Sequence, residues 1–116
     1  MLNFTKIKYG REPVKEFLKE LEENGEIKRV DKIYAYINTL IKYGTRIGYP
    51  HVKHIEDDIW ELRPYSDRIF FFYWKDKTFI LLHHFLKKTN KTPKREIKQA
   101  KRNMKDYLER SDNNGK

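Results

Sequence analysis

The chain has 116 residues, which is enough for one domain with a single hydrophobic core. Hydrophobic residues make up 38 % and charged residues 37 %, so that core must be compact, and the 15 % of aromatic residues supply its bulk. The absence of cysteine excludes a disulfide scaffold, a cysteine zinc site and thiol catalysis. No apolar run approaches the ~20 residues of a membrane span, and the first ten residues lack the apolar stretch of a signal peptide. These features predict a soluble, cytoplasmic protein without a membrane partner.

The net charge of +9 is concentrated towards the C-terminus. Residues 87–105 contain nine lysines and arginines and one acidic residue, Glu96, so this segment alone carries +8. A block of this kind favours a polyanionic partner, because each cation placed beside a phosphate releases condensed counterions. A solvated helix face, or a tail that keeps the protein soluble, is the alternative explanation.

The N-terminal part of the chain predicts one strand and two helices. Residues 2–9 alternate weakly between apolar and polar side chains, as in a strand. Pro13 suits the first turn of a helix, which the pair Asn24–Gly25 ends. A second helix is predicted from about Ile27 to Tyr43, where the apolar residues form one stripe. The short turn between the two helices predicts an αα-hairpin.

The next part of the chain is rich in aromatic and β-branched residues and predicts an antiparallel meander. Its strands are expected over residues 51–55, 59–63, 68–74 and 78–85, with turns at 64–67 and 76–77. A third helix begins near Pro93, with Thr92 as its N-cap. The order predicts an α+β domain over residues 1–110, with two N-terminal helices packed on a sheet of three to five strands and a C-terminal helix. Residues 111–116 are expected to form a disordered tail.

The lengths of the turns set the register between the predicted strands. A four-residue loop places Glu61 opposite Phe70, and a two-residue loop then places Phe72 opposite Leu81. Alternation assigns one set of side chains to a face that packs on the N-terminal helices: Trp60, Leu62, Ile69, Phe71, Tyr73, Ile80, Leu82 and His84. The opposite face carries Ile59, Glu61, Arg63, Arg68, Phe70, Phe72, Trp74, Phe79, Leu81, His83 and Phe85. A one-residue slip in either loop would exchange the faces.

Two arginines mark the polar end of the second face. The register places Arg63 directly opposite Arg68, and like charges in such a pair destabilise a sheet. An anion bound between the two guanidinium groups would stabilise the pair. Neutralisation by Glu61, two residues along the strand, is the alternative. The lysines Lys87 and Lys88, at the start of the basic segment, are expected beside this end of the sheet.

Clustered cations and aromatic rings suit RNA, because cations hold the phosphate and flat side chains stack on the bases. Candidates for RNA contacts in the basic segment are Lys91, Lys94, Arg95 and Lys98. The sequence offers no convergent set of acidic residues for magnesium, so metal-free cleavage by the ribose 2′-OH, without a cofactor, is the chemistry it favours. Charge stabilisers would be Arg63, Arg68, Lys87 and Lys88.

Two adjacent histidines have different expected roles. His83 is the candidate general acid or base, because an ordinary histidine pKa lies near ~6.5. A hydrogen-bonded sheet histidine is the alternative for this residue. His84 lies on the predicted core face and is expected to be a packed structural histidine.

An ordered series of motifs carries a family resemblance: WELR at residues 60–63, RIFF at 68–71, and LHHFLKKTNKTP at 82–93, followed by Glu96, Ile97 and Ala100. The series resembles the HigB-like branch of the RelE/ParE toxin superfamily, including its phage-derived relatives, over roughly residues 2–110. The resemblance implies a RelE-like fold and the toxin of a type II toxin–antitoxin pair that cuts messenger RNA in the ribosomal A site. It also implies a HigA-like antitoxin with a helix-turn-helix domain, through which the pair binds operator DNA.

The resemblance also assigns residues. Arg63 matches the family arginine of the ELR motif, Arg68 matches the arginine after the turn, and the pair Lys87–Lys88 matches the lysines after the last long strand. Lys53 stands where related toxins carry a basic residue. Tyr107 is a candidate for a C-terminal catalytic tyrosine, and it also fits the apolar stripe of the helix.

Two rival functions remain open: a ParE-like inhibitor of DNA gyrase, and a nucleic-acid-binding module without catalysis. The K-K-T-x-K-T-P segment and the arginine pair favour the ribonuclease, because inhibition of gyrase does not require a phosphate-binding face.

Overall fold

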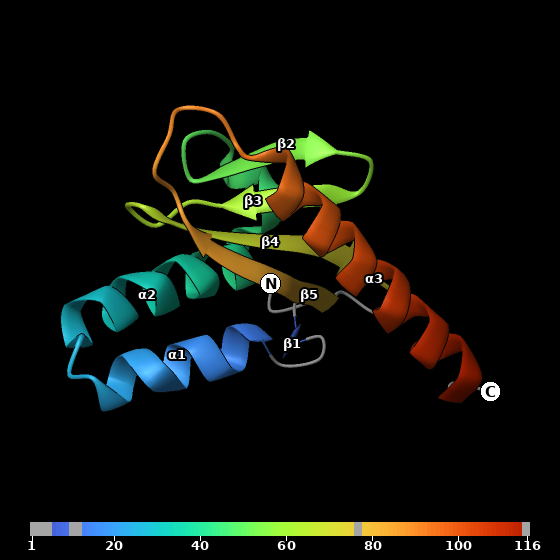
Figure 1. Ribbon diagram of the computed structural model, residues 1–116, viewed down its shortest axis with the longest axis horizontal. Coiled ribbons are helices and arrows are strands. Elements are labelled where there is room, and N and C mark those ends of the chain that lie inside the picture. The colour runs from blue at the N-terminus through green and yellow to red at the C-terminus, as the bar shows by residue number, and fades with distance from the viewer. Residues whose placement is uncertain (1–5, 10–12, 76–77, 115–116) are drawn as a thin grey trace.

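The computed structural model describes residues 6–9, 13–75 and 78–114 (Figure 1). In chain order the elements are β1 (Lys6–Tyr9), α1 (Pro13–Glu23), α2 (Ile27–Tyr43), a 3-10 turn η1 (Gly44–Ile47), β2 (Val52–Glu56), β3 (Ile59–Leu62), β4 (Asp67–Trp74), β5 (Thr78–Leu86) and α3 (Lys94–Asn114). The predicted α+β class is confirmed. Residues 2–5 of the predicted first strand and the predicted turn at 76–77 lie outside the described residues.

The helical hairpin forms where the sequence predicts it. Gly25 ends α1 with a φ of 78°, a left-handed conformation that glycine adopts without a Cβ clash. The Gly25 amide donates to the Glu22 carbonyl at 3.1 Å, and the Glu26 amide donates to the Leu21 carbonyl at 3.0 Å, which satisfies the last carbonyls of α1. The tight turn brings the apolar stripes of both helices onto the same side of the sheet.

In the part of the chain that the structure describes, five strands form one sheet in the order β1-β5-β4-β3-β2. The strands β2 to β5 are the predicted antiparallel meander, and β1 adds a parallel neighbour to β5. Glu61 lies opposite Phe70, and Phe70 lies opposite His83, as the turn lengths predict. The turn before β4 closes with a hydrogen bond of 3.0 Å from the Asp67 amide to the Pro64 carbonyl.

A bulge in β5 corrects the predicted faces. Phe70 pairs with His83 but the next residue, Phe71, pairs with Leu81, so Leu82 is an extra residue in its strand. Phe72 therefore lies opposite Ile80, and the prediction that it faces Leu81 is wrong. Four side chains change face as a result. The expected core residues Ile80 and Leu82 lie on the α3 side, and Phe79 and Leu81 pack with the N-terminal helices.

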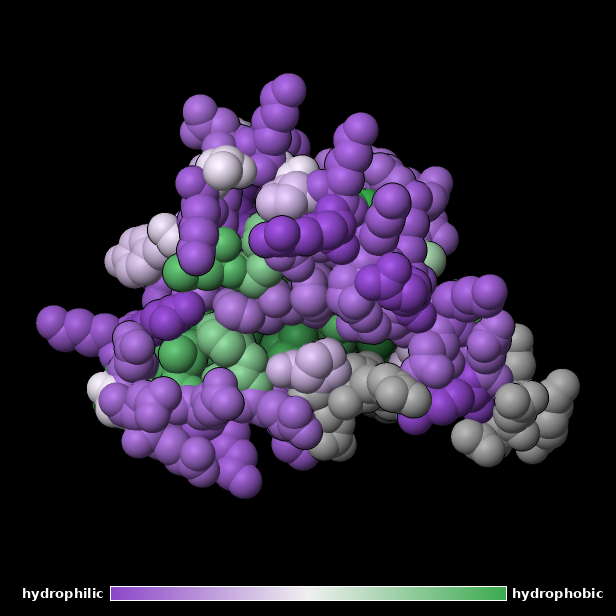
Figure 2. Space-filling view, in the orientation of Figure 1, coloured by the Kyte–Doolittle hydropathy of each residue, from purple (hydrophilic) through white to green (hydrophobic). Residues whose placement is uncertain are grey.

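Helices cover both faces of the sheet. α1 and α2 pack on one face over a core that includes Leu62, Ile69 and Phe71, while α3 crosses the other face over Phe70, Phe72 and Phe85 (Figure 1). Hydrophilic side chains cover most of the face with α3, with a hydrophobic strip near the helical hairpin and β5 (Figure 2). Among the buried polar residues, Glu61, Asp67 and Arg68 lie near the end of the sheet where β3 ends and β4 begins.

The C-terminal helix begins near Pro93, as predicted, but its N-cap and its C-terminal end differ from the prediction. α3 begins at Lys94, and Pro93 supplies the first accepting carbonyl, at 3.1 Å from the Glu96 amide. Thr92 is therefore not the N-cap, and its hydroxyl turns to a carboxylate on β3 instead. We expected a disordered tail from residue 111, but α3 continues to Asn114. Across the described ranges, no helix combines the length and apolar character needed to cross a bilayer.

Candidate nucleic-acid interface

Glu61, Arg63 and Arg68 converge at the end of the β3–β4 pair. Side chains alternate along a strand, so Glu61 and Arg68 face the α3 side of the sheet together with Phe70. Glu61 Oε1 lies 3.6 Å from Arg63 Nε and 3.9 Å from Arg68 Nε. The predicted convergence of the two arginines on one side is therefore present, with Glu61 as a counter-ion to both.

The two guanidinium groups are nearly buried yet incompletely bonded. Arg68 is only 6 % exposed, and its Nη1 donates to the carbonyls of Tyr65 at 2.7 Å and Asp67 at 2.9 Å. Within the described part of the chain, Arg63 Nε and Nη1 and Arg68 Nε have no hydrogen-bond acceptor, because Glu61 is too distant for one. Buried donors normally find partners, so these groups fit a bound anion such as a phosphate.

The arginine cluster is nearly buried and contains more positive than negative charge. Burial, and then the positive charge of Arg63, lower the pKa of Arg68, while Glu61 acts in the opposite direction. The guanidinium nevertheless stays protonated, since its ordinary pKa is far above neutrality. One carboxylate cannot neutralise two guanidinium groups, so the cluster keeps a net positive charge for a ligand. Thr92 Oγ1 lies 3.4 Å from Glu61 Oε2 and ties the loop before α3 to the cluster.

Tyr49 borders the arginine pair and was missed by the sequence analysis. The Arg63 guanidinium carbon lies 4.8 Å from the centroid of its ring. Hydrogen bonding to Arg63 and its charge lower the pKa of Tyr49, and the charges of Lys53 and Lys87 add to this effect. Lys53 pairs with Glu61 in the sheet, and the Lys87 amide donates to the Ser66 carbonyl at 2.8 Å. Both lysines therefore lie at the same end of the sheet as the arginines, where Lys87 was expected. The only signal in the sequence was an aromatic residue in a loop between Gly48 and Pro50.

His83 lies on the same face of the sheet as Arg68 but already has a partner. Its Nε2 is 2.7 Å from Glu96 Oε1 on the first turn of α3, and its ring lies 6.3 Å from that of Phe85, which pairs with Arg68. The histidine is thus a neighbour of the arginine cluster rather than a member of it.

The remaining predicted cations are spread over the outer surface. Lys88 and Arg95 line a separate hollow of about 420 Å³, together with Phe85, Pro93 and Glu96. Four exposed lysines extend the positive surface along the loop and the start of α3: Lys88, Lys91, Lys94 and Lys98. The structure brings none of these into contact with the arginine pair, so they can guide a polyanion but not grip the same phosphate.

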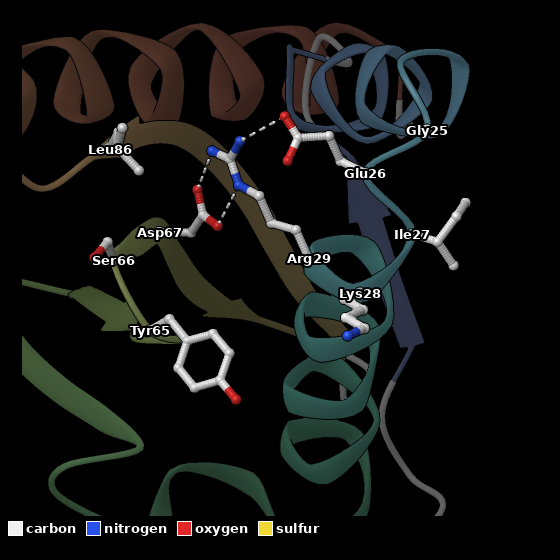
Figure 3. A pocket seen from close by; sticks show the side chains of 9 residues that line it. All are labelled: Gly25, Glu26, Ile27, Lys28, Arg29, Tyr65, Ser66, Asp67 and Leu86. Atoms are coloured by element: carbon white, nitrogen blue, oxygen red, sulfur yellow. Dashed lines mark hydrogen bonds and ion pairs between the residues drawn. The ribbon is translucent and has the colours of Figure 1, made fainter.

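A second polar cluster lies on the opposite side of the sheet. Asp67 accepts two hydrogen bonds from Arg29, at 2.9 and 2.7 Å (Figure 3). On its other side, His84 Nε2 lies 3.1 Å from Asp67 Oδ1. His84 also stacks on Phe17, with ring centroids 3.4 Å apart, so its predicted structural role is confirmed. The neighbouring groove of about 680 Å³ is lined by Ile27, Tyr65 and Leu86 among others (Figure 3). The charged groups of this cluster are already paired, unlike those of the arginine pair.

Tyr107 packs at the far end of the sheet. Its ring contacts Phe72 and Trp74, with centroids 6.2 and 6.0 Å away. Trp74 is six residues along β4 from Arg68, or roughly 20 Å at the usual rise of a strand. Tyr107 therefore belongs to the apolar stripe by which α3 packs on the sheet, and it is not part of the arginine cluster.

A comparison with protein families shows which family the chain belongs to. The family described as "Phage derived protein Gp49-like (DUF891)" matches residues 16–105, which span the helical hairpin, the meander and the start of α3. No curated protein matches the chain. The matched segment contains every residue of the arginine cluster.

Proposed function

Because the chain belongs to the phage-derived Gp49-like family, a family of RelE/HigB-like toxins, we propose that it is the HigB-type toxin of a type II toxin–antitoxin pair and cuts messenger RNA on the ribosome. The observation that carries the proposal is the pair Arg63 and Arg68, whose buried donors lack acceptors within the described chain. Such a pair matches the two non-bridging oxygens of a phosphodiester.

The proposed reaction needs no metal. The ribose 2′-OH attacks the adjacent phosphorus, a base takes its proton, and the bond from phosphorus to the 5′-oxygen breaks as an acid protonates that oxygen. The products are a 2′,3′-cyclic phosphate and a 5′-OH end. Arg63 and Arg68 stabilise the charge that develops on the phosphate, and Lys87 adds to it.

We assign one proton transfer to His83, with Glu96 as its positioning residue. A carboxylate 2.7 Å from Nε2 fixes the orientation of the ring and leaves the other ring nitrogen for transfer. Lys88, which lines a separate hollow, guides the RNA towards the site rather than stabilising charge on the cut phosphate. Contacts to RNA flanking the cut are assigned to Lys53, Lys91, Lys94, Arg95 and Lys98, since all of them are exposed.

The proposed partners follow from the same assignment. The ribosome presents the message in the A site, and a HigA-like helix-turn-helix antitoxin silences the toxin and connects it to operator DNA. Inhibition of DNA gyrase is the rival function. It gives no reason for two buried guanidinium groups with unmatched donors, so the arginine cluster favours the ribonuclease.

Induced expression followed by primer extension on a translated message tests the proposal. We expect cleavage inside codons that disappears when initiation of translation is blocked. Intact messages together with induction of the DNA-damage response would support the gyrase inhibitor instead. Intact messages without that response would support a binding module without catalysis.

The arginines are tested by Arg63→Lys and Arg68→Lys, which keep the charge but lose the planar fork of donors. We expect each variant to lose at least ~100-fold in cleavage rate, the usual cost of removing one charge-stabilising donor. The matched control is Arg110→Lys, because Arg110 forms an exposed ion pair with Asp106 on α3. Normal cleavage by folded Arg63→Lys and Arg68→Lys proteins would show that the site lies elsewhere.

A further inference from the structure

Tyr49 is a large aromatic residue that the fold leaves in solvent. It is 71 % exposed, and its described aromatic contact is the Arg63 guanidinium, 4.8 Å from the ring centroid. A single exposed tyrosine is ordinary on a protein surface. This one differs because the side chain it touches is an arginine whose Nε and Nη1 are buried without an acceptor in the described chain.

The backbone on both sides of Tyr49 is held in place. The Gly48 amide donates to the Thr45 carbonyl at 3.1 Å, and the Val52 amide donates to the Gly48 carbonyl at 3.1 Å. One residue before β2, the His51 carbonyl accepts from the Arg63 amide at 3.0 Å, which ties the loop to the end of β3. The ring is therefore presented from a fixed loop beside the arginine cluster, so little conformational entropy is lost when a ligand binds it.

We propose that Tyr49 and Arg63 form a stacking subsite for one unpaired nucleobase, adjacent to the phosphate held by Arg63 and Arg68. The inference rests on the proposed phosphate site and extends it to the neighbouring base. The phosphate occupies the unmatched guanidinium donors, and the base attached to the same ribose-phosphate lies on the open face of the Tyr49 ring. Lys53, which pairs with Glu61 in the sheet, and Lys87, whose amide donates to the Ser66 carbonyl at 2.8 Å, flank the sugar-phosphate backbone.

The subsite defines a substrate class. Stacking on an aromatic ring tolerates every base, because each base has a flat π-face, but it requires a base that has left its own helix. The proposed ligand is therefore single-stranded RNA without a fixed base identity at this position. A base-paired duplex would leave the Tyr49 ring uncovered.

The experiment measures binding separately from cleavage. The full chain is titrated with a 2′-O-methyl RNA trinucleotide, which cannot be cut, and with the same trinucleotide lacking its central base. The NMR signal of Arg63 Nε–H reports phosphate binding in both titrations, even at millimolar affinity. The variants are Tyr49→Ala and Tyr49→Phe, with Tyr43→Ala as the control, because Tyr43 is 46 % exposed and contacts Lys42 rather than an arginine of the cluster.

We expect the protein to prefer the intact trinucleotide by ~5- to 150-fold, the range that stacking of one base provides. Tyr49→Phe and Tyr43→Ala should keep this preference, and Tyr49→Ala should lose it while binding the abasic probe normally. Equal affinity of the unsubstituted protein for both probes overturns the stacking subsite and leaves the phosphate site intact. A preference that survives Tyr49→Ala, or disappears in Tyr49→Phe, also overturns it. No change of the Arg63 signal with either probe overturns the phosphate site and the subsite together.

Discussion

Glu61 and Asp67 are buried carboxylates that differ in their hydrogen bonds to neighbouring arginines. Asp67 receives a two-point hydrogen bond from Arg29 and a contact from His84, so its oxygens are matched. Glu61 has two arginines within 4 Å but is hydrogen-bonded to neither, and it leaves their donors unmatched. Buried polar groups in a folded protein nearly always have a hydrogen-bond partner, so buried donors without one call for an acceptor such as a ligand, an ion or a water molecule. The comparison separates a structural cluster from a candidate binding cluster.

The Asp67 cluster makes stability depend on pH. Burial by itself would raise the pKa of Asp67, but hydrogen bonds and charge from Arg29 and His84 outweigh it and lower the pKa from 3.8 to about 2. Because the folded value lies below the unfolded one, the stabilisation is present above about pH 4 and is lost as the pH falls towards 2. We expect this loss to be about 2 kcal/mol.

Urea unfolding at a series of pH values measures the effect. In Asp67→Asn the acid-dependent loss should be smaller by that amount, and the variant should be less stable at neutral pH. The control Asp31→Asn removes an exposed carboxylate on α2 and should leave the pH profile unchanged. Parallel pH profiles for the unsubstituted protein and Asp67→Asn would refute the assignment.

At the level of elements, the bulge in β5 connects the sheet to α3. Because Leu82 is an extra residue, the side chains of β5 that precede His83 lie on the sheet face opposite to the one predicted. Ile80 and Leu82 therefore contact the helix. A bulge also leaves a backbone group without a partner in the ladder. Asn103 of α3 donates from Nδ2 to the Leu82 carbonyl at 2.8 Å, and Gln99 donates to the Asn103 oxygen, also at 2.8 Å. The helix therefore completes the hydrogen bonding of the bulge that it packs on.

Asn103→Leu should destabilise the protein by about 1–3 kcal/mol, because the buried Leu82 carbonyl would lose its donor. The same helix offers the control Lys105→Ala, an exposed position whose substitution should stay within about 0.5 kcal/mol. Chemical denaturation of both variants gives the comparison. Equal stabilities for the two would mean that Asn103 does not support the bulge.

At the level of the whole molecule, stability and chemistry occupy different regions. Aromatic side chains fill both sheet faces under the helices, and the excess of positive charge lies in residues 87–105, from the end of β5 into α3. The separation follows from burial, because a charge is costly inside a filled core and must lie where strands end. Substitutions in the core should therefore affect folding, and substitutions at the sheet end should affect function in a folded protein.

Phe71→Ala tests this separation. Phe71 lies on β4 and is completely buried between the sheet and the N-terminal helices. Its truncation should lower the free energy of unfolding by ~3–5 kcal/mol and abolish function through unfolding. Thermal unfolding should show this loss, whereas Arg68→Lys should keep most of the native stability and lose cleavage. A Phe71→Ala protein with native stability would contradict the description of the core.

The sequence by itself determined what depends on neighbours along the chain. The bounds of α2, the αα-hairpin and the register up to the pair of Phe70 and His83 follow from side-chain periodicity, a glycine turn and loop length. These same local rules place Arg63 and Arg68 on one side of the sheet.

Only the tertiary structure decided the features that depend on contacts between distant segments. The bulge at Leu82 contains no glycine that would predict it from the sequence. Its carbonyl accepts a hydrogen bond from Asn103, 21 residues later. The Thr92 hydroxyl donates to Glu61, 31 residues earlier, instead of capping the helix. Tyr49 contacts Arg63 only because β2 pairs with β3. Periodicity reports which face a residue prefers, but hydrogen bonds and charges between distant segments determine what that face finally touches.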